Sequence, residues 1–396
     1  MNLLPKASGT RPRVACEIMP QGVVAARSVD VTSPLAAVAR VSLADGAVAP
    51  SLKPGNIVDR VAVTAAIRHA LEQIGERHNT RDANLTLVIP DSAVRVLLLE
   101  FEALPSRLAE ALPLVRFRLK KLLPFDADDA MVTYPVMSSN KSIVRVLAVA
   151  IPRDVLSEYE TAAREAGFEP GSVLPSTLAC LAAVEDAEPV LLVNANPIGV
   201  TTAIVRSGIL LLHRSVDLQE HLVVTATPLA GLPMPEQPSS ALPLVDPHDS
   251  AGEWAAQQPL PEHGRNPYAD QLADEAAVQE IDNITGLDVP SVYAEGDANI
   301  GASDLQPVAF SAEIAQAVSV AAAYFEDTLA VAPSQVLSAG SLGAEKLAQI
   351  LISSGVGEED GLRVRELVES SALLPDAASA SASRPWLSGV LGALRG

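Results

Sequence analysis

Two stretches of this chain have the same order of elements, a meander of short strands followed by helices, and this repeated order limits the fold more than any other feature. The first stretch has apolar runs at 14–16 and 22–27 around a turn at 20–22, then a helical pattern over 57–78. The second stretch has strand patterns at 189–193, 198–205 and 209–215, then helical patterns at 312–332 and 342–354. This order, occurring twice, predicts an α/β protein with two lobes.

A smaller group of elements lies between the two stretches. Strands are predicted at 85–89, 94–101, 131–137 and 143–151, and a helix at 152–166 that ends before Gly167. We interpret these elements as a small α/β subdomain inserted into the first lobe.

Residues 221–310 differ in composition from the rest of the chain. They hold 11 of the 30 prolines, and 14 acidic side chains against the single base Arg265, so their net charge is −13 within the chain's −20. A segment with so many like charges and so little apolar periodicity cannot bury enough apolar surface to fold. We therefore expect an acidic, proline-rich disordered insertion here.

The bulk properties of the chain exclude several function classes. A net charge of −20 argues against nucleic-acid binding, which needs clustered lysines and arginines. The two cysteines, Cys16 and Cys180, are expected to be reduced thiols of a cytosolic protein. Residues 1–13 lack the apolar core of a signal peptide, and no apolar run reaches the roughly 18 residues of a membrane-spanning helix. We expect a cytoplasmic protein whose link to a membrane comes through a partner.

Three strand–turn segments, at 14–22, 191–200 and 336–343, are the most informative sites in the sequence. Their order and spacing resemble the two phosphate loops and the adenosine loop of the actin-like ATPase superfamily. In that superfamily, glycines let backbone N–H groups approach phosphate oxygens, and aspartates hold Mg²⁺ through water. The resemblance implies a two-lobed actin-like (ribonuclease H-like) fold, and it places the candidate nucleotide-site positions at Glu17, Asn194, Ser338 and Gly340.

Within this superfamily the chain resembles a divergent member of the PilM family of type IV pilus assembly. Residues 90–96 (PDSAVRV) resemble a strand turn of that family. Residues 116–125 (RFRLKKLLPF) resemble its helix that ends in Leu-Pro-Phe, and residues 165–170 (EAGFEP) resemble its Glu-Ala-Ala-Gly-Leu-Glu-Pro segment. The resemblance covers roughly residues 14–220 and 312–370.

The nucleotide loops depart from the superfamily pattern. The triplet from Glu17 to Met19 stands where the first loop has Asp-x-Gly, so a long side chain replaces the glycine at which backbone approaches phosphate. At the second loop, Asn194 replaces the aspartate, and the triplet is followed by Pro197, which has no N–H to donate. At the third loop, Ala339 replaces one of two glycines. We therefore expect no ATP hydrolysis and no cofactor, with ATP and Mg²⁺ as the alternative ligands.

The PilM resemblance implies a scaffold in the inner-membrane platform of a type IV pilus or a type II secretion-like system. The implied partner is the N-terminal tail of a bitopic PilN-like protein, together with pilus motor ATPases and further copies of the chain. Two other functions are considered: an ATP-binding actin-like switch of the same fold, and an enzyme of the sugar-kinase or chaperone kind. The enzyme lacks support because no candidate general base stands beside an intact phosphate loop.

Two further segments carry hypotheses about partners. A basic run in this acidic chain is either a solvated helix face or a docking patch for anionic lipid headgroups or an acidic partner. It contains Arg107, and its candidate partner-binding residues are Arg116, Arg118, Lys120 and Lys121. At the start of the chain, residues 2–5 (NLLP) match the string that opens the groove-binding tail of PilN-type proteins. This is either an accidental match or a tail that occupies the partner groove of its own chain, or of a neighbouring copy, and competes with the partner.

The predicted domain boundaries follow from these patterns. They are a flexible tail (1–13), a first lobe (14–84), its inserted subdomain (85–170), a second lobe built from 171–220 and 311–375, the disordered insertion (221–310), and an Ala/Ser linker with a C-terminal amphipathic helix (376–396).

Overall fold

The computed structural model of the chain describes residues 12–78, 84–185, 188–218, 302–356, 362–378 and 382–396. Its first lobe is built on a five-stranded sheet, sheet A, in which three antiparallel strands are followed by two parallel ones. In spatial order these strands are β3 (Leu35–Ser42), β2 (Gly22–Ser28), β1 (Val14–Met19), β4 (Asn84–Ile89) and β9 (Glu169–Pro175). The predicted hairpin of the first stretch is therefore the centre of this sheet.

The second lobe repeats this topology in a second five-stranded sheet, sheet D. Its spatial order is β12 (Ile209–Asp217), β11 (Gly199–Arg206), β10 (Val190–Asn196), β13 (Gln335–Ala339) and β14 (Arg363–Glu366). Counted from the first strand of each lobe, both sheets run third, second, first, fourth, fifth. The repeat that the strand–helix order predicts is thus present in the strand pairing.

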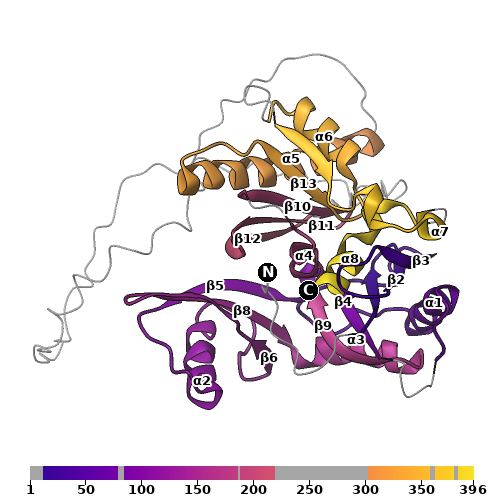
Figure 1. Cartoon of the computed structure of the whole chain (residues 1–396), viewed down its shortest axis with the longest axis horizontal. Helices are drawn as coiled ribbons and strands as arrows, with labels where there is room; N and C mark the ends of the chain where they lie inside the picture. Colours follow the sequence, from indigo (N-terminus) through magenta and orange to yellow (C-terminus); the bar gives the residue numbers. More distant parts are fainter. Residues whose placement is uncertain (1–11, 79–83, 186–187, 219–301, 357–361, 379–381) are drawn as a thin grey trace, which may run out of the picture. The chain divides into compact units, whose positions relative to one another are not determined.

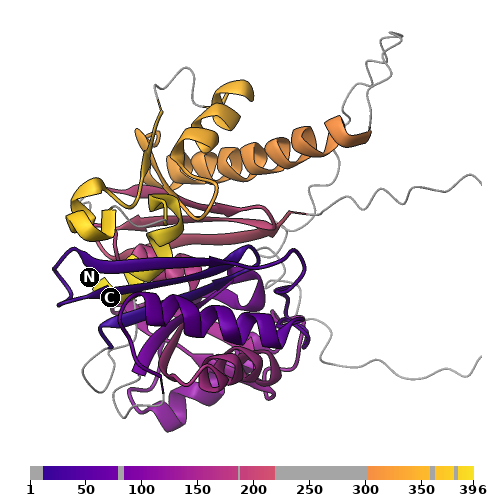
Figure 2. The ribbon, with the colours of Figure 1, turned by 90° about the vertical axis from the view of Figure 1, so that its right-hand side faces the viewer.

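Helices cover both sheets and also separate them (Figures 1 and 2). Helices α1 (Arg60–Gln73) and α3 (Arg153–Glu165) share one hydrophobic core with the outer face of sheet A, and α5 (Ala302–Leu329) and α6 (Ala344–Ser353) share another with sheet D. Two short helices, α4 (Ser176–Leu181) and α8 (Ser388–Arg395), pack against each other and contribute to a third core with residues of both sheets. The facing ends of both sheets therefore meet around α4 and α8.

The inserted subdomain is smaller than predicted. It consists of a separate sheet of β5 (Arg95–Phe101), β8 (Val144–Pro152), β6 (Ala130–Thr133) and β7 (Val136–Ser139), covered by α2 (Leu108–Leu119). The predicted range of 85–170 is wrong at both ends, because β4 and β9 form parallel ladders within sheet A and α3 packs against α1. For the same reason the second lobe does not begin at 171.

Several element boundaries also differ from the prediction. Helix α1 begins at Arg60 rather than at residue 57, because the Asp59 side chain accepts a hydrogen bond from the Ala62 backbone N–H and caps the helix. Helix α5 begins at Ala302, within the range predicted as disordered. Residues 2–5 and 219–301 lie outside the described part of the chain, so the tail and most of the insertion remain predictions. No helix in the described ranges is long and apolar enough to cross a membrane.

The C-terminal segment departs most from the prediction. It contains α7 (Pro375–Ala378) beside β3, a short 3₁₀ turn η5 (Arg384–Leu387), and α8. Helix α8 has no solvent-exposed face of the kind an amphipathic surface helix has, because every residue from Ser388 to Leu394 is buried. Gly389, Gly392 and Ala393 carry little or no side chain, which lets this helix lie between α4 and sheet A.

Candidate functional site

The three strand–turn segments meet around one small cavity between the sheets. The cavity is lined by Glu17, Met19, Asn194 and Gly340 from these segments. Of the four candidate positions, Glu17, Asn194 and Gly340 line the cavity, whereas Ser338 is buried in β13 and does not line it. The cavity volume is about 20 Å³, close to that of a single water molecule.

A network of hydrogen bonds ties together the polar groups of this site. The Ser176 hydroxyl donates to Glu17 Oε1 at 2.7 Å. The Asn194 amide nitrogen lies 3.1 Å from Ser176 Oγ, 3.0 Å from Thr177 Oγ1 and 3.2 Å from Asp91 Oδ2. Thr177 in turn donates to Asp91 from both its backbone N–H and its hydroxyl, at 3.0 and 2.5 Å. The network therefore joins the first lobe to the second.

This network explains why asparagine suits position 194. Its side chain donates towards a carboxylate and two hydroxyls, whereas an aspartate would place a third carboxylate beside Asp91 and Glu17. The sequence patterns do not assign Asp91, Ser176 or Thr177 to the site. The only signal was that Asp91 follows a predicted strand in the turn at 90–92.

The second and third segments pack directly on each other. Gly340 has a φ of +81°, and a Cβ at this position would lie 2.5 Å from the Ala195 carbonyl oxygen and 2.5 Å from Asn194 Oδ1. The Leu342 N–H also donates to the Ala195 carbonyl at 3.1 Å. Because these backbones are in contact, no gap separates the two loops for a nucleotide base.

The C-terminal segment closes the cavity from a third side. Pro385, Trp386, Ser388 and Gly389 all line it. Arg40 of β3 places its guanidinium 3.7 Å from the centroid of the Trp386 ring, a cation–π contact that holds the turn η5 against the first lobe.

The first residues of α8 lie directly against the Glu17 carboxylate. A Cβ at Gly389 would be 2.3 Å from Glu17 Oε2, so the carboxylate fills the space next to the first turn of the helix. Burial, opposed by the hydrogen bond from Ser176 and aided by the nearby charge of Asp91, raises the pKa of Glu17 from 4.5 to about 7. Glu17 is thus a packed and partly protonated acid at neutral pH.

The site does not fit the Mg-ATP that the resemblance of the sequence to the actin-like ATPases implies. A pocket for a molecule of that size measures about 300–1,000 Å³, whereas this cavity measures about 20 Å³. The Glu17 carboxylate already accepts a hydrogen bond from Ser176. The Asn194 side chain directs its amide N–H groups into the site, whereas a cation there would need oxygen ligands. Within the described ranges no group of three or more His, Cys, Asp or Glu side chains is placed to hold a metal ion.

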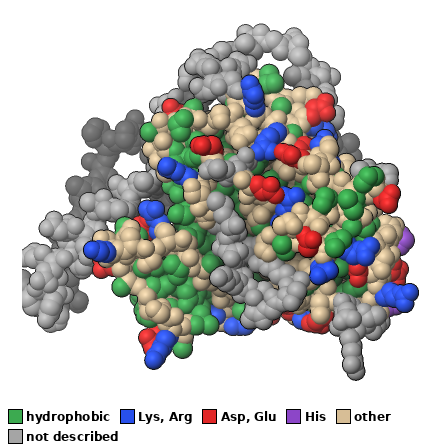
Figure 3. Space-filling view, in the orientation of Figure 1, with side chains coloured by type: hydrophobic (Ala, Val, Ile, Leu, Met, Phe, Trp, Pro, Cys, Tyr) green, Lys and Arg blue, Asp and Glu red, His purple; other side chains and the backbone are tan. Residues whose placement is uncertain are grey.

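The basic run extends from the N-cap residue of α2 to the turn after the helix, and only part of it is available to a partner. Arg116 turns inward and donates to the carbonyls of Ala127 and Ala130, so it has a structural role. Lys120 forms an ion pair with Asp128 at 2.6 Å. Arg118 is exposed, and the Lys121 ammonium lies 5.9 Å from the centroid of the Phe117 ring. Figure 3 shows hydrophobic side chains gathered over the lower left of the molecule, where Figure 1 places α2.

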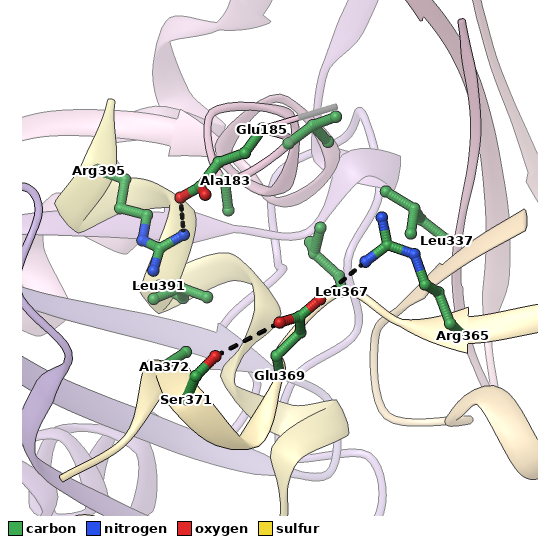
Figure 4. A pocket seen from close by; sticks show the side chains of 11 residues that line it. Ala183, Glu185, Leu337, Arg365, Leu367, Glu369, Ser371, Ala372, Leu391 and Arg395 are labelled. Atoms are coloured by element: carbon green, nitrogen blue, oxygen red, sulfur yellow. Dashed lines mark hydrogen bonds and ion pairs between the residues drawn. The ribbon is translucent and has the colours of Figure 1, made fainter. Parts of the chain in front are cut away.

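A larger cavity, of about 260 Å³, lies at the other end of α8. Figure 4 shows its two arginines, Arg365 and Arg395, each beside a glutamate. Arg395 pairs with Glu185 at 2.5 Å, and Arg365 pairs with Glu369 at 3.1 Å. Because these charges balance, this cavity offers no excess positive charge for phosphate, and none of the nucleotide-site positions lines it.

The fold and the site together define a class, a two-lobed actin-like protein whose interlobe cleft is filled by its own C-terminal helix. The structure is similar to a solved "PilM-PilN type IV pilus biogenesis complex", with a TM-score of 0.61, 14% identity and coverage of 97% of each chain. The expected resemblance to PilM is thereby confirmed at the level of the fold.

Two further solved structures have lower TM-scores. EutJ, an ethanolamine utilization protein from Carboxydothermus hydrogenoformans, has a TM-score of 0.42 and 10% identity over 99% of this chain and 92% of its own. The cytoplasmic domain of EpsL from the type II secretion system of Vibrio cholerae has a TM-score of 0.35 and 13% identity over 52% of this chain and 71% of its own. No family model and no curated protein matches the sequence.

Proposed function

We propose that the chain is a non-catalytic scaffold of a type IV pilus or type II secretion-like assembly, located in the cytoplasm at the inner membrane. It binds the N-terminal tail of a bitopic PilN-like protein and couples that protein to the cytoplasmic motor. The observation that carries this proposal is the filled cleft, in which Trp386, Gly389 and Glu17 occupy the space between the three loops. The likeness to a chain of a PilM–PilN type IV pilus biogenesis complex, which extends over 97% of both chains, supports the choice of partner.

Mg-ATP at millimolar concentration is expected to leave the melting temperature of the full chain unchanged and to release no phosphate. A ligand that binds the folded state stabilises it by RT ln(1+[L]/Kd), which amounts to several degrees when the ligand is far above its Kd. Differential scanning fluorimetry with ATP, ADP and Mg²⁺ alone measures this effect. A saturable rise that disappears in Asn194→Ala would establish the alternative, an ATP-binding switch from which the C-terminal segment withdraws.

A peptide with the N-terminal tail of a PilN-like protein from the same genome is expected to bind the full chain. A scaffold holds this tail independently of nucleotide, so the Kd measured by fluorescence anisotropy should be the same with and without Mg-ATP. A scrambled peptide of identical composition is the control. Equal signals for the scrambled and native peptides would refute the scaffold assignment, whereas a Kd that changes with Mg-ATP would favour the switch.

A further inference from the structure

Helix α2 exposes large apolar side chains on the face that points away from its own sheet. Ala111, Val115 and Leu119 are buried against the inserted sheet. On the other side Phe117 is 63% exposed and Leu114 is 43% exposed, and Leu108 and Leu122 near the two ends are 65% and 53% exposed. The other five phenylalanines of the chain are buried or half-buried, so Phe117 is the exposed one in a protein with only 3% aromatic residues.

Cations accompany this apolar face. Leu114, Phe117 and Lys121 are spaced by three and four residues, so they follow one side of the helix. Arg118 is adjacent to Phe117 and is exposed, and Lys121 lies over the Phe117 ring. The other basic side chains of the run have partners within the chain. Arg116 binds backbone carbonyls, Lys120 pairs with Asp128, and Arg107 pairs with Glu110, the acid on this side of the helix.

We propose that this face, formed by Leu114, Phe117, Arg118 and Lys121, lies on the anionic surface of a lipid bilayer. A convex helix with an exposed aromatic ring flanked by cations suits the boundary between headgroups and acyl chains, where the ring is buried and the cations meet phosphates. The helix lies on the membrane and does not cross it, as expected from its 12 residues. An acidic protein surface is the alternative ligand of the two cations, and the vesicle experiment includes it as an outcome.

The contact is weak by itself and orients the protein rather than anchoring it. Each cation near an anionic surface increases binding by about fivefold. Stable attachment takes a second point of contact, because two linked weak contacts multiply each other through a raised effective concentration. A bitopic partner supplies such a point, but the lipid contact itself does not depend on the proposed scaffold function.

The test is co-sedimentation of the full chain with vesicles in the absence of any partner. We expect binding to vesicles of equal parts phosphatidylcholine and phosphatidylglycerol at about 50 mM salt, and much weaker binding to phosphatidylcholine alone or at high salt. Phe117→Ser is expected to reduce binding at least tenfold, and Arg118→Gln and Lys121→Gln about fivefold each. These side chains are exposed, so the variants should keep the melting temperature of the parent chain.

Helix α6 provides matched controls. Ile352 is 65% exposed and Lys346 is exposed, so Ile352→Ser and Lys346→Gln remove the same kinds of group from another helix. These changes should leave vesicle binding unchanged. Equal loss in the control variants, equal binding to neutral vesicles, or no binding to anionic vesicles would overturn the proposal. Competition by soluble polyglutamate together with full binding by Phe117→Ser would also overturn it, and would identify an acidic protein surface instead.

Discussion

Replacing Gly392 with alanine is expected to lower the free energy of unfolding by about 3 kcal/mol, at the upper end of the cost of overpacking a core. A Cβ at this position would lie 1.9 Å from the Ala179 carbonyl oxygen and 2.5 Å from the Ala179 carbonyl carbon. Both atoms belong to the backbone of α4, so no side-chain rotation can relieve the overlap. In an ordinary helix the same change would stabilise the protein by roughly 1 kcal/mol. A destabilising effect would therefore indicate that α8 is in close contact with α4. Urea unfolding of both proteins measures it.

Gly389 offers the matched comparison, because its neighbour is a side chain. Gly389→Ala alone should destabilise the protein, since the new Cβ would overlap the Glu17 carboxylate. In a Glu17→Ala background this overlap disappears, and Gly389→Ala should become neutral or stabilising, whereas Gly392→Ala should stay destabilising. If Gly392→Ala were neutral in either background, α8 would not lie against α4 as described.

Replacing Glu17 with glutamine is expected to stabilise the protein above neutral pH by up to about 3 kcal/mol, and to have little effect near pH 4. Burial raises the pKa of Glu17 from 4.5 to about 7. Between these values the unfolded chain releases the proton while the folded chain keeps it. The contribution of Glu17 to stability is therefore complete below pH 4.5 and is lost as the pH rises to about 7, at roughly 1.4 kcal/mol per tenfold change in acidity.

The measurement is the difference in unfolding free energy between the parent protein and Glu17→Gln across pH 4 to 8.5. Glutamine keeps the shape of the side chain and an oxygen that can accept from Ser176, but it does not titrate. Glu326→Gln, at an exposed site on α5, serves as the control for the same substitution outside the core. A difference for Glu17→Gln that is equally flat would show that the carboxylate is solvated in the folded protein.

The local elements of both lobes could be predicted from the sequence. Apolar runs predict the hairpin of β1 and β2 and the meander from β10 to β12. Gly22, Pro197 and Gly208 mark the turns between these strands, and such turn signals depend only on residues a few positions apart. The limits of the inserted subdomain could not be predicted in this way. The apolar runs of β4 and β9 are the same whether they pair within sheet A or with the inserted sheet, and only the parallel ladders decide between the two.

At the candidate site, too, local residue chemistry could be predicted from the sequence and long-range contacts could not. The residue types at its loops, such as Glu17, Asn194 and Pro197, argued against a working phosphate site because their side-chain chemistry is known without the fold. Their hydrogen-bonded partners were not foreseen, since Ser176 lies 159 residues from Glu17 and Asp91 lies 103 residues from Asn194. Periodicity and spacing carry no information about pairs so far apart.

The sequence by itself determined the repeated strand–helix order, the turns that end its strands, and the residue types at the three loops, because each depends on the chemistry of adjacent residues. Only the tertiary structure decided what occupies the cleft. The pattern of α8 is that of an amphipathic surface helix, yet Gly389 and Gly392 leave room for Glu17 and for the backbone of Ala179, and the chain returns its last residues to the core between the two sheets. The physical reason is that a glycine on a helix shows where close packing is possible, while the path of the whole chain sets which surface fills that space.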